Sequence, residues 1–385
     1  MPRPKARASL LVSLTLLELT GCKRATTASL PPSAPGAGGA SGAPEAGGAT
    51  SSGGASSGGS AAKGGTSATG GQPASGGAAT NGGAGASGLT SGGVAGVDAS
   101  AGGVPSFDGG VPAPRPITPP PTYQGTVNNA AGCSQQYATH GFEPDDAPGT
   151  RHPLFLYFTG TNFFSDAAAF RDQSAPAANA VTEAMARRGF VALWAEYDNG
   201  AVAWLSDHGA QLECLFDTDS TTLLAVACAL PEVDCDLGIA TWGHSQGAFV
   251  ANRASGFEPR VRAAWLAGYG GDAMSTMPKG RIRVENGEND TTNGQVSTVD
   301  TVTGLTPADC PDDGTSSCFR ADGSGWVIVR AKDCVTSTAD HCWFDHKTCT
   351  DSQVVLEPNF VDRASTKPFA LEKNADWVAA TARRP

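Results

Sequence analysis

The sequence lacks a surplus of basic residues, and it lacks a long apolar run at its N-terminus. Lys and Arg total 26 against 37 Asp and Glu, which leaves a formal net charge of -11 at pH 7. Such a chain offers no broad basic surface for phosphates, so nucleic acid is not expected as a partner. The apolar run at residues 8–17 is shorter than the roughly 20 residues that a membrane-spanning helix needs. It therefore does not predict a transmembrane helix.

Aromatic residues are nearly missing from residues 30–121, where Phe107 is the only one. The stretch is built almost entirely from Gly, Ala, Ser, Thr and Pro, with too little apolar side chain to offset the entropy lost on ordering. We expect a disordered tether over residues 23–122, with a root-mean-square span of roughly 50 to 60 Å as a Gly-rich coil. The alternative is a folded glycine-rich repeat, but the stretch shows no fixed period.

The first 22 residues have the pattern of an export signal. Basic residues precede the short apolar run, and small residues end it. The ending, Leu19-Thr20-Gly21-Cys22, resembles the lipobox of bacterial lipoproteins. The resemblance implies cleavage before Cys22 and acylation of its thiol, so the mature protein would be anchored to a membrane with the tether as a stalk. Lys23 stands where an inner-membrane retention aspartate would be, which implies the outer membrane or cell surface.

Cysteine usage agrees with export. Nine of the ten cysteines remain beyond Cys22, and in an oxidising compartment most are expected to form disulfides. Short separations favour the pairs Cys228–Cys235, Cys310–Cys318 and Cys342–Cys349, with one thiol left over. A zinc site that uses His341, Cys342, His346 and Cys349 is the alternative. No paired Cys-x-x-Cys accompanies these residues, so we expect no metal and no organic cofactor.

From residue 123 onward, apolar runs of strand length alternate with helical segments. Buried strands are expected at residues 154–158, 190–194, 237–242, 261–266, 282–284 and 326–329. Helices are expected at residues 166–188, 214–230, 248–255 and 367–384, with the first divided or restarted at Pro176. The alternation predicts an α/β fold: a mostly parallel central sheet, covered by helices on both faces, in a domain over residues 123–385. Its active site would lie at the carboxyl ends of the strands.

One segment interrupts this alternation. Residues 291–325 are polar, rich in Gly and Asp, and contain Cys310 and Cys318. We expect a disulfide-held insertion near the active-site end, as part of a cover.

The most informative motif is Gly243-His244-Ser245-Gln246-Gly247, which directly follows the apolar run at 237–242 and precedes a helix-compatible segment. Strand, sharp turn and helix form the context of a nucleophile elbow. A serine at the tip of that turn is presented clear of the sheet, and the flanking glycines let strand and helix approach closely. Ser245 is therefore the candidate nucleophile.

From about Pro153 onward, this order of elements and the elbow resemble the α/β-hydrolase family. Residues 285–290, Glu-Asn-Gly-Glu-Asn-Asp, are similar to the family's acid loop, which implies Asp290 as the acid and leaves Asp272 as the alternative. The family's chain order is nucleophile, acid, histidine, which leaves His341 and His346 as candidate bases. We favour His341, because its surroundings resemble family histidine loops in which a small residue or a cysteine follows the base.

An oxyanion hole needs two backbone donors. The N–H of Gln246 follows the serine, and the N–H of Thr161 follows Gly160 after the 154–158 run. Aromatic residues that could line a substrate pocket, or equally belong to the core, are Phe163, Phe164 and Trp204.

Together these residues predict an exported, lipid-anchored serine hydrolase. Ser245, His341 and Asp290 would cleave a small-molecule or lipid carboxylic ester through an acyl-enzyme, and the protein is expected to be a monomer. Three alternatives stay open: a peptidase or polyester depolymerase on the same fold, a lyase or transferase with the same triad, and a non-catalytic surface-binding lipoprotein.

Overall fold

The computed structural model describes residues 113–127, 130–161, 167–200, 208–217, 219–271, 275–292, 296–310 and 316–384. The chain divides into two units, residues 1–90 and 91–385, and all described residues belong to the second. Several predictions therefore lie outside the described residues: the export signal, Cys22, most of the tether, Phe163, Phe164, Trp204 and Asp272. Among the residues that are described, no helix combines the length and apolarity that crossing a membrane would require.

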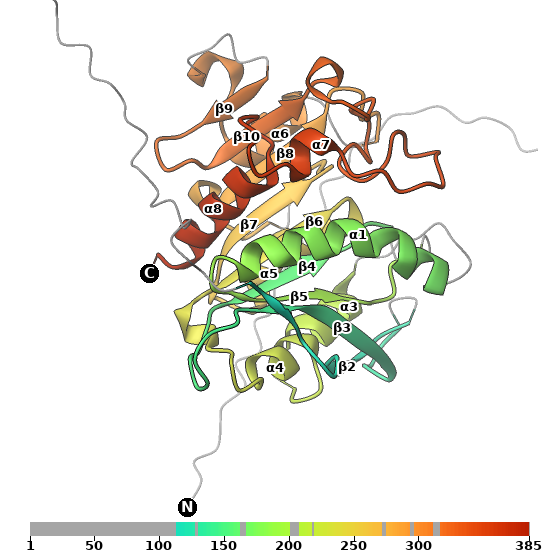
Figure 1. The fold of residues 1–385 in the computed structure, drawn as a ribbon, viewed down its shortest axis with the longest axis vertical. Helices are drawn as coiled ribbons and strands as arrows, with labels where there is room; N and C mark the ends of the chain where they lie inside the picture. Colours follow the sequence, from blue (N-terminus) through green and yellow to red (C-terminus); the bar gives the residue numbers. More distant parts are fainter. Residues whose placement is uncertain are drawn as a thin grey trace, which may run out of the picture. The chain divides into compact units, whose positions relative to one another are not determined.

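A ten-stranded sheet forms the centre of the described unit (Figure 1). Its order is β1-β3-β5-β4-β6-β7-β8-β10-β9, with β2 paired to β3. Neighbours from β5 through β10 are parallel, whereas β1, β2, β3 and β9 pair in the antiparallel direction. The strands are β1 Arg115–Pro116, β2 Thr122–Gly125, β3 Gln135–Glu143, β4 Leu154–Phe158, β5 Val191–Ala195, β6 Ile239–His244, β7 Val261–Ala267, β8 Ile282–Gly287, β9 Ser317–Phe319 and β10 Gly325–Val329.

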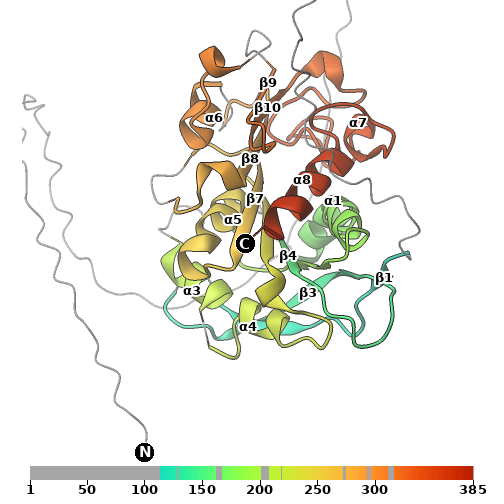
Figure 2. The same ribbon diagram turned by 90° about the vertical axis from the view of Figure 1, so that its left-hand side faces the viewer.

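Helices cover both faces of this sheet, as Figure 2 shows. The helices α1 and α8 pack on one face, and α3 and α5 pack on the other. The helices are α1 Ala167–Ala186, α3 Gly209–Phe216, α4 Leu223–Cys228, α5 Gln246–Phe257, α6 Val296–Thr303, α7 Pro358–Val361 and α8 Leu371–Ala382. Short 3-10 turns are η1 Cys235–Leu237, η2 Lys279–Arg281, η3 Pro307–Asp309 and η4 Ala331–Asp333.

The strand β4 shows why continuous apolar runs suit the centre of this sheet. All five of its residues are buried. Leu154, Leu156 and Phe158 belong to the core under α3 and α5, whereas Phe155 and Tyr157 belong to the core under α1 and α8. Because successive side chains point to opposite faces, a strand covered on both faces needs apolar residues at every position. The mixed α/β class and the predicted central strands are confirmed.

Two helix predictions were wrong. A single helix over residues 214–230 is replaced by α3 and α4, because the chain turns after Phe216 and the Thr222 side chain caps α4 by accepting the Ala225 N–H. The helix α1 continues through Pro176 instead of dividing there. Proline removes one helical hydrogen bond, but buried Ala177 and Val181 on the same helix keep it packed on the sheet.

The described residues form four disulfides, three of which confirm the expected local pairs, Cys228–Cys235, Cys310–Cys318 and Cys342–Cys349. The fourth joins Cys133 to Cys214, which are 81 residues apart in sequence. Cys334 is free. Cys342 and Cys349 lie near Asp340 in a group of potential metal ligands. Their sulfurs are bonded to each other, so they do not offer the thiolates that the zinc alternative requires.

The insertion prediction for residues 291–325 needs correction. The segment contains α6, and β9 adds to the edge of the sheet by pairing with β10. Val299 and Leu305 pack into the core beside Trp326. The segment is therefore largely an integral part of the sheet and its covering layer, because its few apolar residues are spaced to reach that core.

Candidate active site

Ser245 lies between β6 and α5 in a strained backbone conformation, with φ 53° and ψ -118°. Positive φ is uncommon for residues other than glycine and is typical of a nucleophile elbow. The flanking glycines are required by close contacts. A Cβ at Gly243 would lie 2.0 Å from the Gly247 carbonyl oxygen, and one at Gly247 would lie 2.2 Å from that of Phe158. The sequence thus positions Ser245 at the carboxyl end of β6.

The predicted acid and base are hydrogen-bonded to each other. His341 Nδ1 lies 2.8 Å from Asp290 Oδ2, and the second carboxylate oxygen accepts the Thr292 N–H at 2.9 Å. Asp290 follows β8 and its side chain is fully buried. His346 pairs with Asp345 instead. Of the two candidate histidines, His341 is therefore the one whose orientation Asp290 fixes.

A cavity of about 490 Å³ brings Ser245 and His341 together. It lies beyond the carboxyl ends of β4 and β6. Its lining combines aromatic, polar and charged side chains: Tyr157, Thr159, Gly160, Thr161, Gln173, Ser174, His244, Ser245, Thr292, His341, Cys342, Phe344, Asp345, His346, Cys349, Thr350, Asp351 and Ser352.

The two residues predicted to supply the oxyanion donors, Thr161 and Gln246, contact each other through their side chains, and Thr161 lines the cavity. Thr161 Oγ1 donates a hydrogen bond of 3.1 Å to Gln246 Oε1, which ties the loop after β4 to the residue that follows Ser245. A Cβ at Gly160 would lie 3.3 Å from the Ser245 Cβ, so the loop runs directly beside the serine.

Asn199 positions this loop, and the sequence analysis did not identify it. Its Nδ2 donates to the Gly160 carbonyl at 2.7 Å and to Thr159 Oγ1 at 2.9 Å. In a trans peptide the C=O and N–H point in opposite directions. Asn199 therefore directs the Thr161 N–H away from itself. The only available signal was a polar residue shortly after a buried strand, which is too common to single out.

His244, next to the serine, links the elbow to the histidine loop. Burial lowers the pKa of His244 to about 3, with the nearby His341 acting in the same direction. The neutral ring places Nε2 2.8 Å from the His341 carbonyl oxygen, to which it donates. The two imidazoles lie 4.7 Å apart between centroids. His244 thus helps to hold the backbone of His341 beside Ser245.

Residues 341–352 form much of one wall of the cavity, whereas only Thr292 of the described part of 291–325 lines it. The cover predicted for residues 291–325 is therefore wrong for those residues. The Asp340 carboxylate accepts the N–H groups of Cys342 and Cys349, at 3.0 and 2.8 Å, beside the disulfide that joins the two cysteines. Trp343 and Phe344 are buried in the aromatic core below. The wall is thus anchored at Cys342, at the two aromatic residues that follow and at Cys349.

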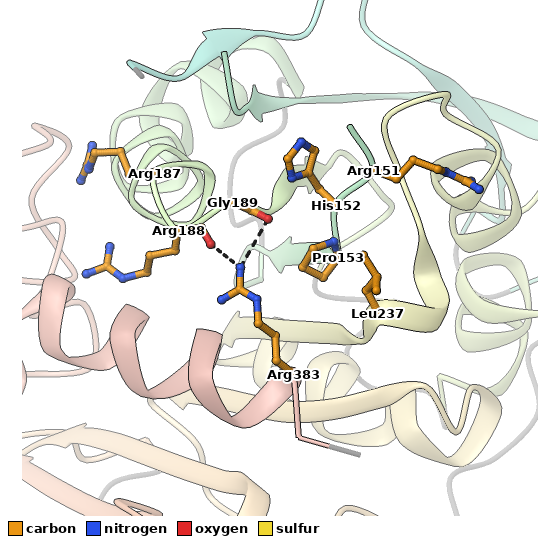
Figure 3. A pocket seen from close by; sticks show the side chains of 8 residues that line it. All are labelled: Arg151, His152, Pro153, Arg187, Arg188, Gly189, Leu237 and Arg383. Carbon is orange, nitrogen blue, oxygen red and sulfur yellow. Dashed lines mark hydrogen bonds between the residues drawn. The ribbon is translucent and has the colours of Figure 1, made fainter. Parts of the chain in front are cut away.

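A second hollow, of about 340 Å³, lies near the amino ends of β4, β5 and β6 (Figure 3). Arg383 points across it and donates to the carbonyl oxygens of Arg188 and Gly189. Arg188 is paired with Glu372 and Asp376 on α8. These contacts join α8 to the turn between α1 and β5, so the hollow belongs to a structural clasp.

Comparison with known proteins adds little to this geometry. No protein-family model and no curated protein matches the chain. A hypothetical protein, PA2218, from Pseudomonas aeruginosa is 18% identical over 44% of this chain and 46% of its own, with a TM-score of 0.28. An esterase from the fungus Rhizomucor miehei is 11% identical over 50% of this chain and 72% of its own, with a TM-score of 0.34. DcsB, solved with a substrate analogue, is 18% identical over 40% of this chain and 45% of its own, with a TM-score of 0.26. The chain thus spans less than half the length of two of these structures.

Proposed function

We propose that the protein is a serine hydrolase that cleaves carboxylic esters through an acyl-enzyme. The observation that supports this most is the convergence, in one cavity, of a strained serine and a histidine held by a buried aspartate. Serine, histidine and aspartate in this order act as nucleophile, general base and orienting acid.

In the proposed reaction, Ser245 Oγ attacks the ester carbonyl carbon while His341 Nε2 takes the hydroxyl proton. Asp290 accepts the Nδ1–H, keeps the imidazole oriented and stabilises the imidazolium. The tetrahedral oxyanion would accept hydrogen bonds from the N–H groups of Gln246 and Thr161. His341 then returns the proton to the departing alcohol, and water repeats the sequence to release the acid and regenerate Ser245.

The disulfides support an oxidising compartment, which agrees with the proposed export. Attachment through Cys22 is proposed from the lipobox alone. Expression of wild type and Cys22→Ser in a bacterial host should place the wild type in the membrane fraction and release the variant. Equal membrane retention of both would contradict the lipid anchor.

The nucleophile is tested with a fluorophosphonate probe. Wild type should be labelled, and Ser245→Ala should lose both labelling and ester hydrolysis. Ser174→Ala is a matched control. Ser174 lines the same cavity but lies within the helix α1 instead of on a strained turn. Equal labelling of wild type and Ser245→Ala would eliminate Ser245 as the nucleophile. Cleavage of peptides but not esters would favour a peptidase, and inertness toward both would favour a binding protein.

A further inference from the structure

A second histidine–carboxylate pair lines the proposed catalytic cavity. His346 Nδ1 lies 2.8 Å from Asp345 Oδ1, and the two side chains are only 14% and 13% exposed. Both residues line the cavity together with Ser245. The reaction proposed above uses neither of them.

The backbone of this pair is held in place. The His346 N–H donates to the Cys342 carbonyl at 3.0 Å, and the Val355 N–H donates to the Asp345 carbonyl at 2.9 Å. His346 also forms an antiparallel bridge with Val354. Because Phe344 is buried just before the pair and Cys349 is in a disulfide just after it, the imidazole is presented from an anchored loop.

The surroundings of His346 favour the protonated ring. The hydrogen bond that His346 Nδ1–H donates to Asp345 raises the pKa of His346, desolvation opposes this rise, and the charges of Asp345, Asp340 and Asp351 add to it. Burial raises the pKa of Asp345, and the bond to His346 opposes that rise. On the other side, His346 lies close enough to His244 to lower the pKa of that buried ring. The Nδ1–H of the protonated ring donates to Asp345, so Nε2–H is its second donor. Among the described residues, none accepts a hydrogen bond from this Nε2–H.

The charges around the cavity limit what this donor can bind. Asp345 and Asp351 line the cavity, and no Lys or Arg is among its described lining residues. The two aspartates outweigh the single positive charge of a protonated His346, so the described lining keeps a net negative formal charge and would repel a substrate carboxylate. A neutral carbonyl oxygen can accept the hydrogen bond without that penalty.

We propose that His346 is a specificity-determining residue that donates a hydrogen bond from Nε2 to a neutral carbonyl beyond the scissile ester. The preferred substrates are then diesters or oligoesters, and half-esters with a free carboxylate are disfavoured. This inference rests on the proposed ester hydrolysis at Ser245.

Three small esters test the inference on the full chain. Dimethyl succinate has a second neutral carbonyl, methyl hexanoate has the same length without it, and monomethyl succinate replaces it with a carboxylate. His346→Phe keeps a planar ring and removes the donor. In this variant, kcat/KM for dimethyl succinate should fall about tenfold. The fall in kcat/KM for methyl hexanoate should be several times smaller. Equal losses on both esters would overturn the role of His346.

The pH dependence separates hydrogen-bond donation from a packing role. In wild type, the ratio of kcat/KM for dimethyl succinate to that for methyl hexanoate should fall as pH rises through the raised pKa of His346, because the donor is lost. In His346→Phe the ratio should not change with pH. If that variant does not fold, Asp345→Asn serves instead and should move the fall in the ratio to lower pH. A ratio that is independent of pH in wild type contradicts the proposal.

Charge selectivity is the second measurement. Asp351→Asn should raise kcat/KM for monomethyl succinate severalfold relative to dimethyl succinate, and no change would remove the charge argument. Absence of hydrolysis of all three esters by wild type would refute the proposed function itself. Hydrolysis with no preference among the esters would refute only the role of His346.

Discussion

Two histidines that line the cavity, His341 and His346, each pair with a carboxylate at the same hydrogen-bond length, and their expected roles differ. His341 and Asp290 are 51 residues apart, and His346 and Asp345 are neighbours, yet each pair is joined at 2.8 Å. The first pair joins two loops, and its histidine is tied to the elbow through His244. The second pair lies within one anchored loop. A short contact between histidine and carboxylate therefore does not distinguish the two expected roles by itself; what differs is the link of His341 to the elbow through His244.

The largest expected difference between the pairs is in turnover. Asp290→Asn should lower kcat on a simple ester by about 10⁴-fold, because it alters the tautomer and charge support that the base needs. Asp345→Asn is the matched substitution in the other pair and should cost far less on the same ester. Steady-state kinetics of both variants checks this. Losses of similar size would show that the two pairs cannot be told apart by their position.

An intermediate effect is expected from the disulfide that closes the cavity wall. Replacing both Cys342 and Cys349 by Ser should lower the free energy of unfolding by about 2 kcal/mol and reduce the preference for dimethyl succinate over methyl hexanoate. The matched control is the double replacement of Cys228 and Cys235, which have the same separation of 7 residues but do not line the cavity. Denaturant unfolding and ester kinetics are the measurements. If both double variants change the preference for dimethyl succinate, the change reflects a general loss of stability and not the cavity wall.

A smaller effect is expected at Glu357, which anchors the segment before both histidines. Its carboxylate accepts the N–H groups of Val335, Thr336 and Ser337. Burial raises the pKa of Glu357, but the backbone donors together lower it by more than burial raises it, so the net pKa lies below its usual value. Glu357→Gln should cost about 1 to 2 kcal/mol at pH 7.

The pH dependence of that cost has a defined sign. A lowered carboxyl pKa stabilises the fold above the unfolded value of about 4.3, and this contribution is lost as pH falls through the folded pKa. The difference in unfolding free energy between wild type and Glu357→Gln should therefore be largest near neutrality and should shrink below about pH 4. Urea unfolding at several pH values measures it. A constant difference would show that the carboxylate charge is not what anchors the segment.

Local patterns predicted much of the fold. The runs at residues 154–158 and 190–194 predicted central strands, because a strand buried on both faces must be apolar throughout. The short spacings of Cys228–Cys235 and Cys342–Cys349 predicted their pairing. The segment at residues 291–325 was misjudged, because its polar composition concealed an edge strand that is defined only by pairing with β10.

The candidate site also combines residues that the sequence identifies with residues that only the folded chain reveals. Gly243, Ser245 and Gly247 could be identified from the sequence, because a strained turn between strand and helix restricts the residues that fit. Asn199 and Glu357 could not, because each acts by binding backbone groups whose positions only the folded chain defines.

The sequence alone determined the alternation of buried strands and helices, the elbow at Ser245 and the chain order that leaves two candidate histidines, since these depend on residue type and spacing. Only the tertiary structure decided that Asp290 binds His341, that His346 has its own carboxylate and that residues 341–352 wall the cavity. Hydrogen bonds between distant loops depend on where the sheet and core place the backbone, and no local pattern records that position.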